Sequence, residues 1–148
     1  MRIGLGNDHH GVELKNRIIN YLNSKGISYI NYGCDSKEDI ENIDFVDYAL
    51  KVCNGINNKE VDLGILICGT GIGMSIAANK VDNIMAAKVT TPREAHLCRE
   101  HNKANVMTLS EYTENLEEIL DNFIYTEPST VERYARRIDK INNIRKNS

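Results

Sequence analysis

The amino-acid sequence predicts a Rossmann-like three-layer α/β sandwich, with a five-stranded parallel sheet between helices and an extra C-terminal helix. Strand-like segments alternate with segments whose apolar residues recur at helical spacing, which is the order typical of a parallel sheet. Residues 63–67 form a continuous apolar run, as expected for a strand covered on both faces. Because the chain of 148 residues has the length of one ordinary domain, we expect 1–148 to form a single domain.

Each expected element has its own signal. The expected strands are residues 2–7, 28–32, 63–67, 85–89 and 105–109. The expected helices are residues 12–25, 45–56, 74–80, 91–101, 116–124 and a last helix from 129–132 toward Arg145. Gly26 stands where a glycine ends the first helix, and the segment from Thr91 to Glu94 combines an N-cap, a proline and a capping-box glutamate. The segment from Ser129 to Glu132 predicts a second capping box.

Composition excludes several classes of partner. The net charge is −3, from 18 basic and 21 acidic side chains, without the clustered positive field that nucleic acid or an acidic membrane requires. We see no signal peptide and no apolar run long enough to span a membrane. The four cysteines form no C-x-x-C pair and no disulfide framework, so we expect a reducing, cytoplasmic setting.

Two segments rich in chemical groups are expected to meet at one edge of the sheet. Ligands of open parallel sheets bind beyond the carboxyl ends of the strands, where the strand order reverses. In the common order 2-1-3-4-5 that point lies between the first and third strands. Residues 7–11 (NDHHG) follow the first strand and residues 68–75 (CGTGIGMS) follow the third.

The glycine-rich loop predicts an anion site. Gly69, Gly71 and Gly73 can point N–H groups at a phosphate or a developing oxyanion, although a purely structural turn is the alternative. A dinucleotide fingerprint needs a glycine where Met74 stands, and a Walker loop needs a Gly-Lys-Ser/Thr that is absent. Cys68 precedes this loop, where a thiolate could serve as base or nucleophile, whereas Cys53 lies on an apolar helical face and is expected to be inert.

Further polar residues have two interpretations each. Asp8, His9 and the neighbouring His10 fit a substrate contact better than a metal site. His101 ends a helix of about eleven residues, roughly 16 Å long, which places it near the wrong edge of its own sheet. It is either a helix C-terminal charge partner or a residue of a neighbouring subunit's site. Arg133 and Arg137 share a helical face that is either solvated or suited to a phosphate, and the last helix packs on its own domain or on a partner.

These residues resemble the ribose-5-phosphate isomerase B family, which includes galactose-6-phosphate isomerase subunits. The core of the resemblance is residues 66–80, from Leu66-Ile67-Cys68 to Asn79-Lys80. Asp8-His9 with Gly11, residues 99–102, and Arg133 with residues 136–141 support it in the right order.

The resemblance implies a set of roles. Cys68 would move the proton between C2 and C1, and the N–H groups of the Gly69–Gly73 loop would stabilise the enediolate. Thr70, Asp8 and His101 would assist ring opening. Substrate-binding residues would be His9, Gly69, Gly71, Gly73, Ser75, Asn102, Arg133 and Arg137. Asn102 would join His101 in a partner's site. The family works as dimers or dimer pairs, without a metal or an organic cofactor.

The sequence also departs from the family pattern. Tyr112 stands where the family usually has an arginine, and Tyr134 where it has a histidine. Phe45, Met85 and residues 89–91 also differ. We therefore expect an aldose–ketose isomerase, first of all converting ribose 5-phosphate to ribulose 5-phosphate through an enediolate. The alternatives are an isomerase of allose 6-phosphate or galactose 6-phosphate, a non-catalytic phosphosugar-binding protein, and a thiol redox protein.

Overall fold

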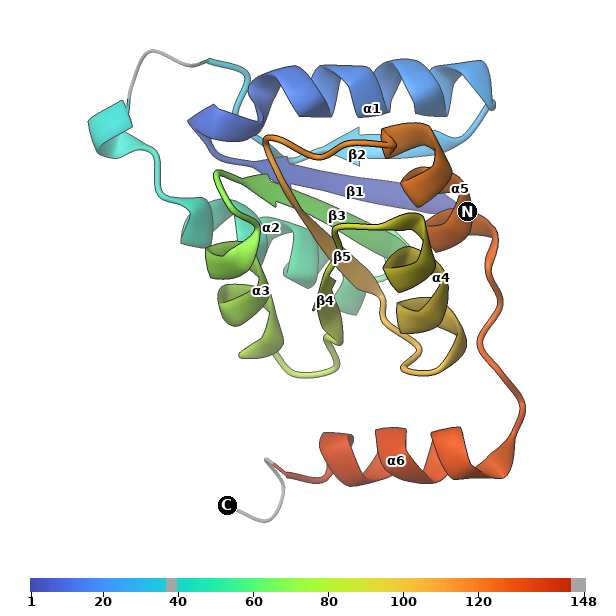
Figure 1. The fold of residues 1–148 in the computed structure, drawn as a ribbon. Helices are drawn as coiled ribbons and strands as arrows, with labels where there is room; N and C mark the ends of the chain where they lie inside the picture. The colour runs from blue at the N-terminus through green and yellow to red at the C-terminus, as the bar shows by residue number, and fades with distance from the viewer. Residues whose placement is uncertain (37–39, 145–148) are drawn as a thin grey trace.

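The computed structural model describes residues 1–36 and 40–144, and in these residues one parallel sheet is formed by five strands. The strands are β1 (Arg2–Asn7), β2 (Ser28–Asn31), β3 (Leu63–Cys68), β4 (Ala86–Lys88) and β5 (Val106–Ser110). Helices cover both faces of the sheet, so the predicted three-layer α/β architecture is confirmed (Figure 1).

The strand order is β2-β1-β3-β5-β4, and the expected order 2-1-3-4-5 is therefore wrong. The reason lies in the two last strands. β5 has the sequence VMTLS with its first four residues buried, whereas β4 has the sequence AAK and no buried residue. The apolar strand takes the central place beside β3, and the short, small-residue strand takes the edge. The reversal between β1 and β3 is as predicted.

The helices divide between two cores. They are α1 (Val12–Ser24), α2 (Phe45–Asn57), α3 (Ile72–Asn79), α4 (Pro92–Glu100), α5 (Leu116–Tyr125) and α6 (Glu132–Asn142), with short 3-10 helices η1 (His9–Gly11) and η2 (Ile40–Asn42). One core joins α1, α4 and α5 to the face of β3 that carries Ile65 and Ile67. The other joins α2 and α3 to the face that carries Leu66 and Cys68. Cys68 therefore lies on the face of the sheet that α2 and α3 cover.

Two of the predicted helix signals are confirmed and one is wrong. Gly26 has φ 67 and follows α1, and Thr91 and Glu94 form the expected capping box of α4. The N-cap of α6 is Val131, which makes no side-chain cap bond, because the Ser129 hydroxyl accepts from the Val131 N–H instead. The expected end of that helix, Arg145, lies outside the described residues.

Helix α6 lies apart from the other elements (Figure 1). It buries none of its residues. Ile141 in the helix is 44% exposed, and Ile144, two residues after its end, is 65% exposed. A helix with an exposed isoleucine and no buried face does not close a core of its own domain. Among the described residues, every helix is too short or too polar to span a lipid bilayer.

Candidate active site

The ends of β1 and β3 bring the two predicted site segments together. Asn7 pairs with Ile67 in the parallel register, and the N–H of Asp8 donates to the Ile67 carbonyl at 3.3 Å. Gly11 packs so closely on Ile67 that an added Cβ would lie 2.8 Å from its side chain. The expected convergence of residues 7–11 and 68–75 is therefore confirmed.

Cys68 lies at the start of the glycine-rich loop, with its side chain aimed into it. The N–H of Gly71 donates a hydrogen bond to Cys68 Sγ at 3.1 Å, and Cys68 is 5% exposed. Gly71 is the N-cap of α3, with φ 78, in the left-handed region that glycine tolerates best. The Thr70 hydroxyl accepts from the Ile72 N–H at 3.1 Å. The thiol thus faces a donor at a helix N-terminus, which stabilises negative charge on sulfur.

The surroundings of the other thiols differ from those of Cys68. Burial raises the pKa of both Cys53 and Cys98 to about 11, so these two groups are protonated at neutral pH. Cys34 donates to the Ser36 carbonyl at 2.8 Å. The prediction that Cys53 is inert agrees with its burial.

Residues at the end of β5 hold the glycine-rich loop by hydrogen bonds. The Glu111 N–H donates to the Cys68 carbonyl at 3.1 Å, and the Ser110 hydroxyl donates to the Gly69 carbonyl at 3.1 Å. The buried Thr108 hydroxyl donates to the Gly71 carbonyl at 2.8 Å. Sequence reasoning missed these residues, because the expected strand order did not place β5 beside β3.

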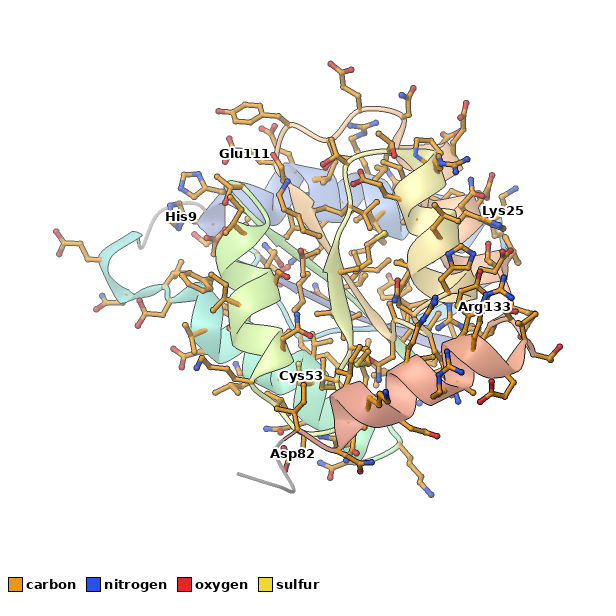
Figure 2. All side chains as sticks on the ribbon, turned by 60° about the horizontal axis from the view of Figure 1, so that its bottom comes forward. His9, Lys25, Cys53, Asp82, Glu111 and Arg133 are labelled. Atoms are coloured by element: carbon orange, nitrogen blue, oxygen red, sulfur yellow. The ribbon has the colours of Figure 1, made fainter. Side chains whose placement is uncertain are left out.

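The polar residues after β1 line the same edge. Asp8 is 6% exposed, and its Oδ1 accepts from the His10 N–H at 3.0 Å. The rings of His9 and His10 lie 4.0 Å apart, and His10 Nδ1 is 2.9 Å from Glu111 Oε2. Figure 2 shows His9 and Glu111 at one end of the molecule, far from Arg133. Within the described part of the chain, no group of three or more His, Cys, Asp or Glu side chains is arranged to hold a metal.

The remaining predicted residues form a separate cluster around Tyr134. The His101 ring stacks on the Tyr134 ring, with centroids 4.4 Å apart and an interplanar angle of 9°. The guanidinium groups of Arg133 and Arg137 lie 4.8 and 5.8 Å from the centre of the same ring. Asn102 follows His101 at the end of α4 and is exposed. The structure brings these residues together, but not with the Cys68 loop.

Two more predicted residues, Gly73 and Ser75, lie on the first turn of α3. A Cβ on Gly73 would come within 2.8 Å of the Phe45 ring, so this glycine permits close packing against α2. Ser75 is half-buried, and its N–H donates to the Gly71 carbonyl at 3.2 Å.

Lys15 is a buried charge that sequence reasoning missed. Its side chain is fully buried, and Nζ donates to the Cys34 carbonyl at 2.6 Å and to Asp35 Oδ1 at 2.5 Å. Hydrogen bonds from Lys15 and then Asn31 hold the pKa of the Asp35 carboxyl below its ordinary value. Asn7 Nδ2 donates to the same Cys34 carbonyl at 2.9 Å. The segment around Cys34 is thereby fixed against the end of β1, next to Asp8.

Fold and site together define a small doubly wound α/β enzyme, with a thiol and a glycine-rich loop before a helix N-terminus at the carboxyl edge of its sheet. The chain belongs to the ribose/galactose isomerase family, whose model matches residues 3–141. It is 41% identical over 116 residues to ribose-5-phosphate isomerase B of Escherichia coli, covering 78% of this chain and 76% of that one. It is 39% identical over 144 residues to a probable ribose-5-phosphate isomerase B of Mycoplasma genitalium, covering 94% and 92%.

Solved structures agree with this assignment. Ribose-5-phosphate isomerase B of Clostridium thermocellum superposes with a TM-score of 0.92 at 41% identity, covering 99% of both chains. The Mycoplasma genitalium enzyme with bound ribulose 5-phosphate gives a TM-score of 0.90 at 37% identity, covering 99% of this chain and 97% of that one. The chain is therefore a sugar-phosphate isomerase.

Proposed function

We propose that this enzyme interconverts ribose 5-phosphate and ribulose 5-phosphate through an enediolate, with Cys68 as the base. The observation that carries the proposal is the hydrogen bond from the Gly71 N–H to Cys68 Sγ at the N-terminus of α3. It supports a role for Cys68 as the base, beside a glycine-rich loop whose N–H groups would act as oxyanion donors, because this proton transfer needs both groups.

The reaction follows from that pair. The Cys68 thiolate removes the proton from C2 of the open-chain aldose, and the electron pair of the C–H bond forms the C1–C2 double bond. The C1 carbonyl oxygen becomes negative and is stabilised by N–H groups of the Gly69–Gly73 loop. The thiol then returns the proton to C1, where the electron pair of the C1–C2 double bond forms the new C–H bond. The C2 hydroxyl proton passes to the C1 oxyanion, and the electron pair of that O–H bond forms the C2 carbonyl of the ketose. Thr70 and Asp8 contact the sugar oxygens, Ser75 lines the loop, and His9 binds the phosphate.

We also infer that each active site is shared between two subunits of a homodimer or tetramer. His101, Asn102, Arg133 and Arg137 would complete a partner's site, with the two arginines on its phosphate. The distance of Arg133 from His9 and Glu111 along the molecule supports this role (Figure 2), as does the unburied α6. The proposal includes no metal or organic cofactor and no nucleic acid or membrane partner. We infer that the enzyme is cytoplasmic.

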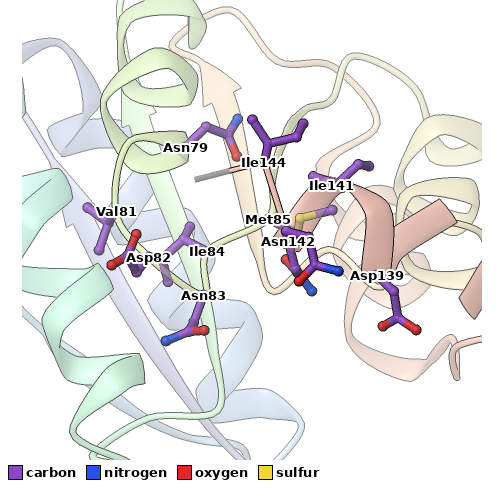
Figure 3. A pocket seen from close by; sticks show the side chains of 11 residues that line it. Asn79, Val81, Asp82, Asn83, Ile84, Met85, Asp139, Ile141, Asn142 and Ile144 are labelled. Carbon is purple, nitrogen blue, oxygen red and sulfur yellow. The ribbon is translucent and has the colours of Figure 1, made fainter. Parts of the chain in front are cut away.

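A hollow beside α6 supports the same inference. It has a volume of about 910 Å³ and lies between α6 and the turn that follows α3. Figure 3 shows Ile84 on one side of it and Ile141 on the other. Apolar side chains on both walls leave room for a segment of a second copy.

The choice of ribose 5-phosphate as substrate is inferred mainly from related proteins, because one of them was solved with bound ribulose 5-phosphate. Allose 6-phosphate and galactose 6-phosphate are the competing substrates, and a non-catalytic phosphosugar binder is the competing function. Tyr112 and Tyr134 stand where the family usually has an arginine and a histidine, so the phosphate end is where the substrates would be distinguished.

A ketose-formation assay on the three aldose phosphates tests the proposal. We expect turnover of ribose 5-phosphate, loss of at least about a thousandfold in Cys68→Ala, and no loss in the buried-thiol control Cys53→Ala. Faster turnover of allose 6-phosphate or galactose 6-phosphate would make that sugar phosphate, rather than ribose 5-phosphate, the preferred substrate. Binding without turnover of any of the three would favour the non-catalytic binder.

A further inference from the structure

His10 and Glu111 form a pair across the mouth of the catalytic loop. His10 belongs to η1, after β1, and Glu111 follows β5, so their side chains meet over the end of β3 that lies between them. His10 Nδ1 lies 2.9 Å from Glu111 Oε2. A Cβ built on Gly69, the residue after Cys68, would lie 3.7 Å from both His10 Cδ2 and Glu111 Oε2. The pair is therefore in van der Waals reach of the loop that holds the reacting carbons.

The contacts orient the imidazole. A carboxylate on Nδ1 accepts the proton of that nitrogen, which leaves Nε2 of the neutral ring as a proton acceptor. The His10 backbone N–H is held by Asp8 Oδ1 at 3.0 Å, and the His9 ring lies 4.0 Å away. Tyr112 bonds the Glu111 carboxylate, which raises the pKa of the tyrosine. The His10 side chain is 49% exposed and that of Glu111 is 24% exposed, so a ligand can reach the ring.

We propose that His10 and Glu111 form a dyad that takes part in opening the ring of the cyclic aldose phosphate within the same subunit as Cys68, beside the assistance that the family resemblance gives to Thr70, Asp8 and His101. This inference rests on the proposed function, because only an aldose substrate has a ring to open before its C2 proton becomes acidic. Neither side chain has a part in the proton transfer or the phosphate binding proposed above.

The step balances as a proton relay. His10 Nε2 takes the proton of the anomeric hydroxyl, and the electron pair of that O–H bond forms the C1 carbonyl. The bond between C1 and the ring oxygen breaks, and its electron pair leaves with the ring oxygen. The same imidazolium, stabilised by the Glu111 carboxylate, then gives its proton to that oxygen, so His10 ends neutral. His10 is a catalytic residue in this step, and Glu111 is a positioning residue that acts through it.

The two directions of the reaction separate ring opening from isomerisation. Ribose 5-phosphate is cyclic in solution, whereas ribulose 5-phosphate cannot close a five-membered ring, because its C5 oxygen carries the phosphate. An enzyme without the dyad can still convert the ketose to the free aldehyde. It can use the aldose only as fast as the ring opens with the assistance that Thr70, Asp8 and His101 still give.

The experiment compares initial rates in both directions for the wild type, His10→Ala and Glu111→Gln. The control is His96→Ala, which removes the histidine of another exposed pair, His96–Glu100, 2.8 Å apart on α4. For His10→Ala we expect ketose consumption within about twofold of the wild type. Aldose consumption should fall by at least about tenfold, which is less than the roughly hundredfold low end of acid–base contributions because Thr70, Asp8 and His101 remain. Glu111→Gln should show the same directional split to a smaller extent, and His96→Ala no split.

Other outcomes would overturn the inference. An equal loss in both directions would give the pair a structural role only, and an unchanged aldose rate would remove it from ring opening. The wild type tests the proposed function separately, since absence of turnover in both directions would refute the isomerase itself.

Discussion

The Gly71 N–H points at Cys68 Sγ at a distance of 3.1 Å, and Gly71 can do so because its φ is 78. The sulfur, the donor and the start of α3 therefore depend on one backbone conformation. That conformation is held from the far side by Thr108, whose hydroxyl donates to the Gly71 carbonyl at 2.8 Å. Catalysis and the stability of this turn should change together when it is altered.

Gly71→Ala tests this coupling. The substitution places a side chain at positive φ, which costs about 1–2 kcal/mol, and its Cβ would lie 3.0 Å from the Leu109 backbone. We expect a lower melting temperature and a loss of kcat of at least about tenfold, since the donor to Cys68 moves. Gly26→Ala is the matched control, because Gly26 has φ 67 with nothing within 4 Å of an added Cβ. An equal loss of kcat in both variants would contradict the coupling.

The pair of Lys15 and Asp35 should make stability depend on pH. The lysine and Asn31 lower the pKa of the Asp35 carboxyl in the folded state. A carboxyl with a lowered folded pKa contributes stability above its ordinary value, near pH 4, and loses it as pH falls through the folded value. We expect Asp35→Asn to unfold at lower denaturant concentration than the wild type at pH 7, and the gap to shrink at pH 3. A gap that is constant between these pH values would contradict this assignment.

Removing the lysine tests the buried end of the same pair. Lys15→Ala leaves the Cys34 carbonyl without one of its donors and a gap in the core. We expect a loss of about 2 kcal/mol or more in the free energy of unfolding, measured by urea denaturation. Lys15→Met, which fills the gap, should recover part of it. Equal stability of the alanine variant and the wild type would show that the buried ammonium contributes nothing.

The thiols should differ in their reaction with iodoacetamide. Cys68 faces a backbone donor, whereas burial raises the pKa of Cys53 and Cys98 to about 11. We expect the native enzyme at neutral pH to be alkylated first at Cys68, with activity lost in proportion, as mapped by peptide mass spectrometry. Substrate should slow the reaction. Labelling of Cys53 or Cys98 before Cys68 would contradict the assignment of the reactive thiol.

Subunit mixing tests the shared site. Cys68→Ala and His101→Ala dimers are each expected to be inactive. Their exchange should restore about a quarter of wild-type activity, since half of the random dimers carry one intact site. Mixing Cys68→Ala with Cys68→Ser is the control and should restore none. Absence of recovery after confirmed exchange would place His101 outside the partner's site.

Much of the fold follows from local patterns. Three predictions needed only residues that are close together in the sequence, and the structure confirms all three. They are the apolar strand β3, the glycine after α1 and the capping box of α4. The order of β4 and β5 was mispredicted because it depends on which strand can be buried on both faces, a comparison between distant segments. The capping box at Ser129 failed because its hydroxyl bonds two residues ahead rather than three.

The site shows the same division. Cys68 and the glycines that follow it are close together in the sequence, so they can be recognised as one motif. The closeness of this motif to Asp8 follows from the parallel pairing of β1 and β3. Lys15 has no such signal, because a lysine on an amphipathic helix is ordinarily exposed. The meeting of His10 with Glu111 depends on β5 lying beside β3, and nothing local to either residue indicates it.

The most direct test of the account is proton exchange at C1 of the ketose in heavy water, followed by NMR during turnover of ribose 5-phosphate. If Cys68 moves the proton through an enediolate, the wild type should incorporate solvent deuterium at C1 of the ribulose 5-phosphate. Cys68→Ser should incorporate none above the enzyme-free rate. Turnover without any deuterium at C1, or undiminished incorporation in Cys68→Ser, would contradict Cys68 as the base.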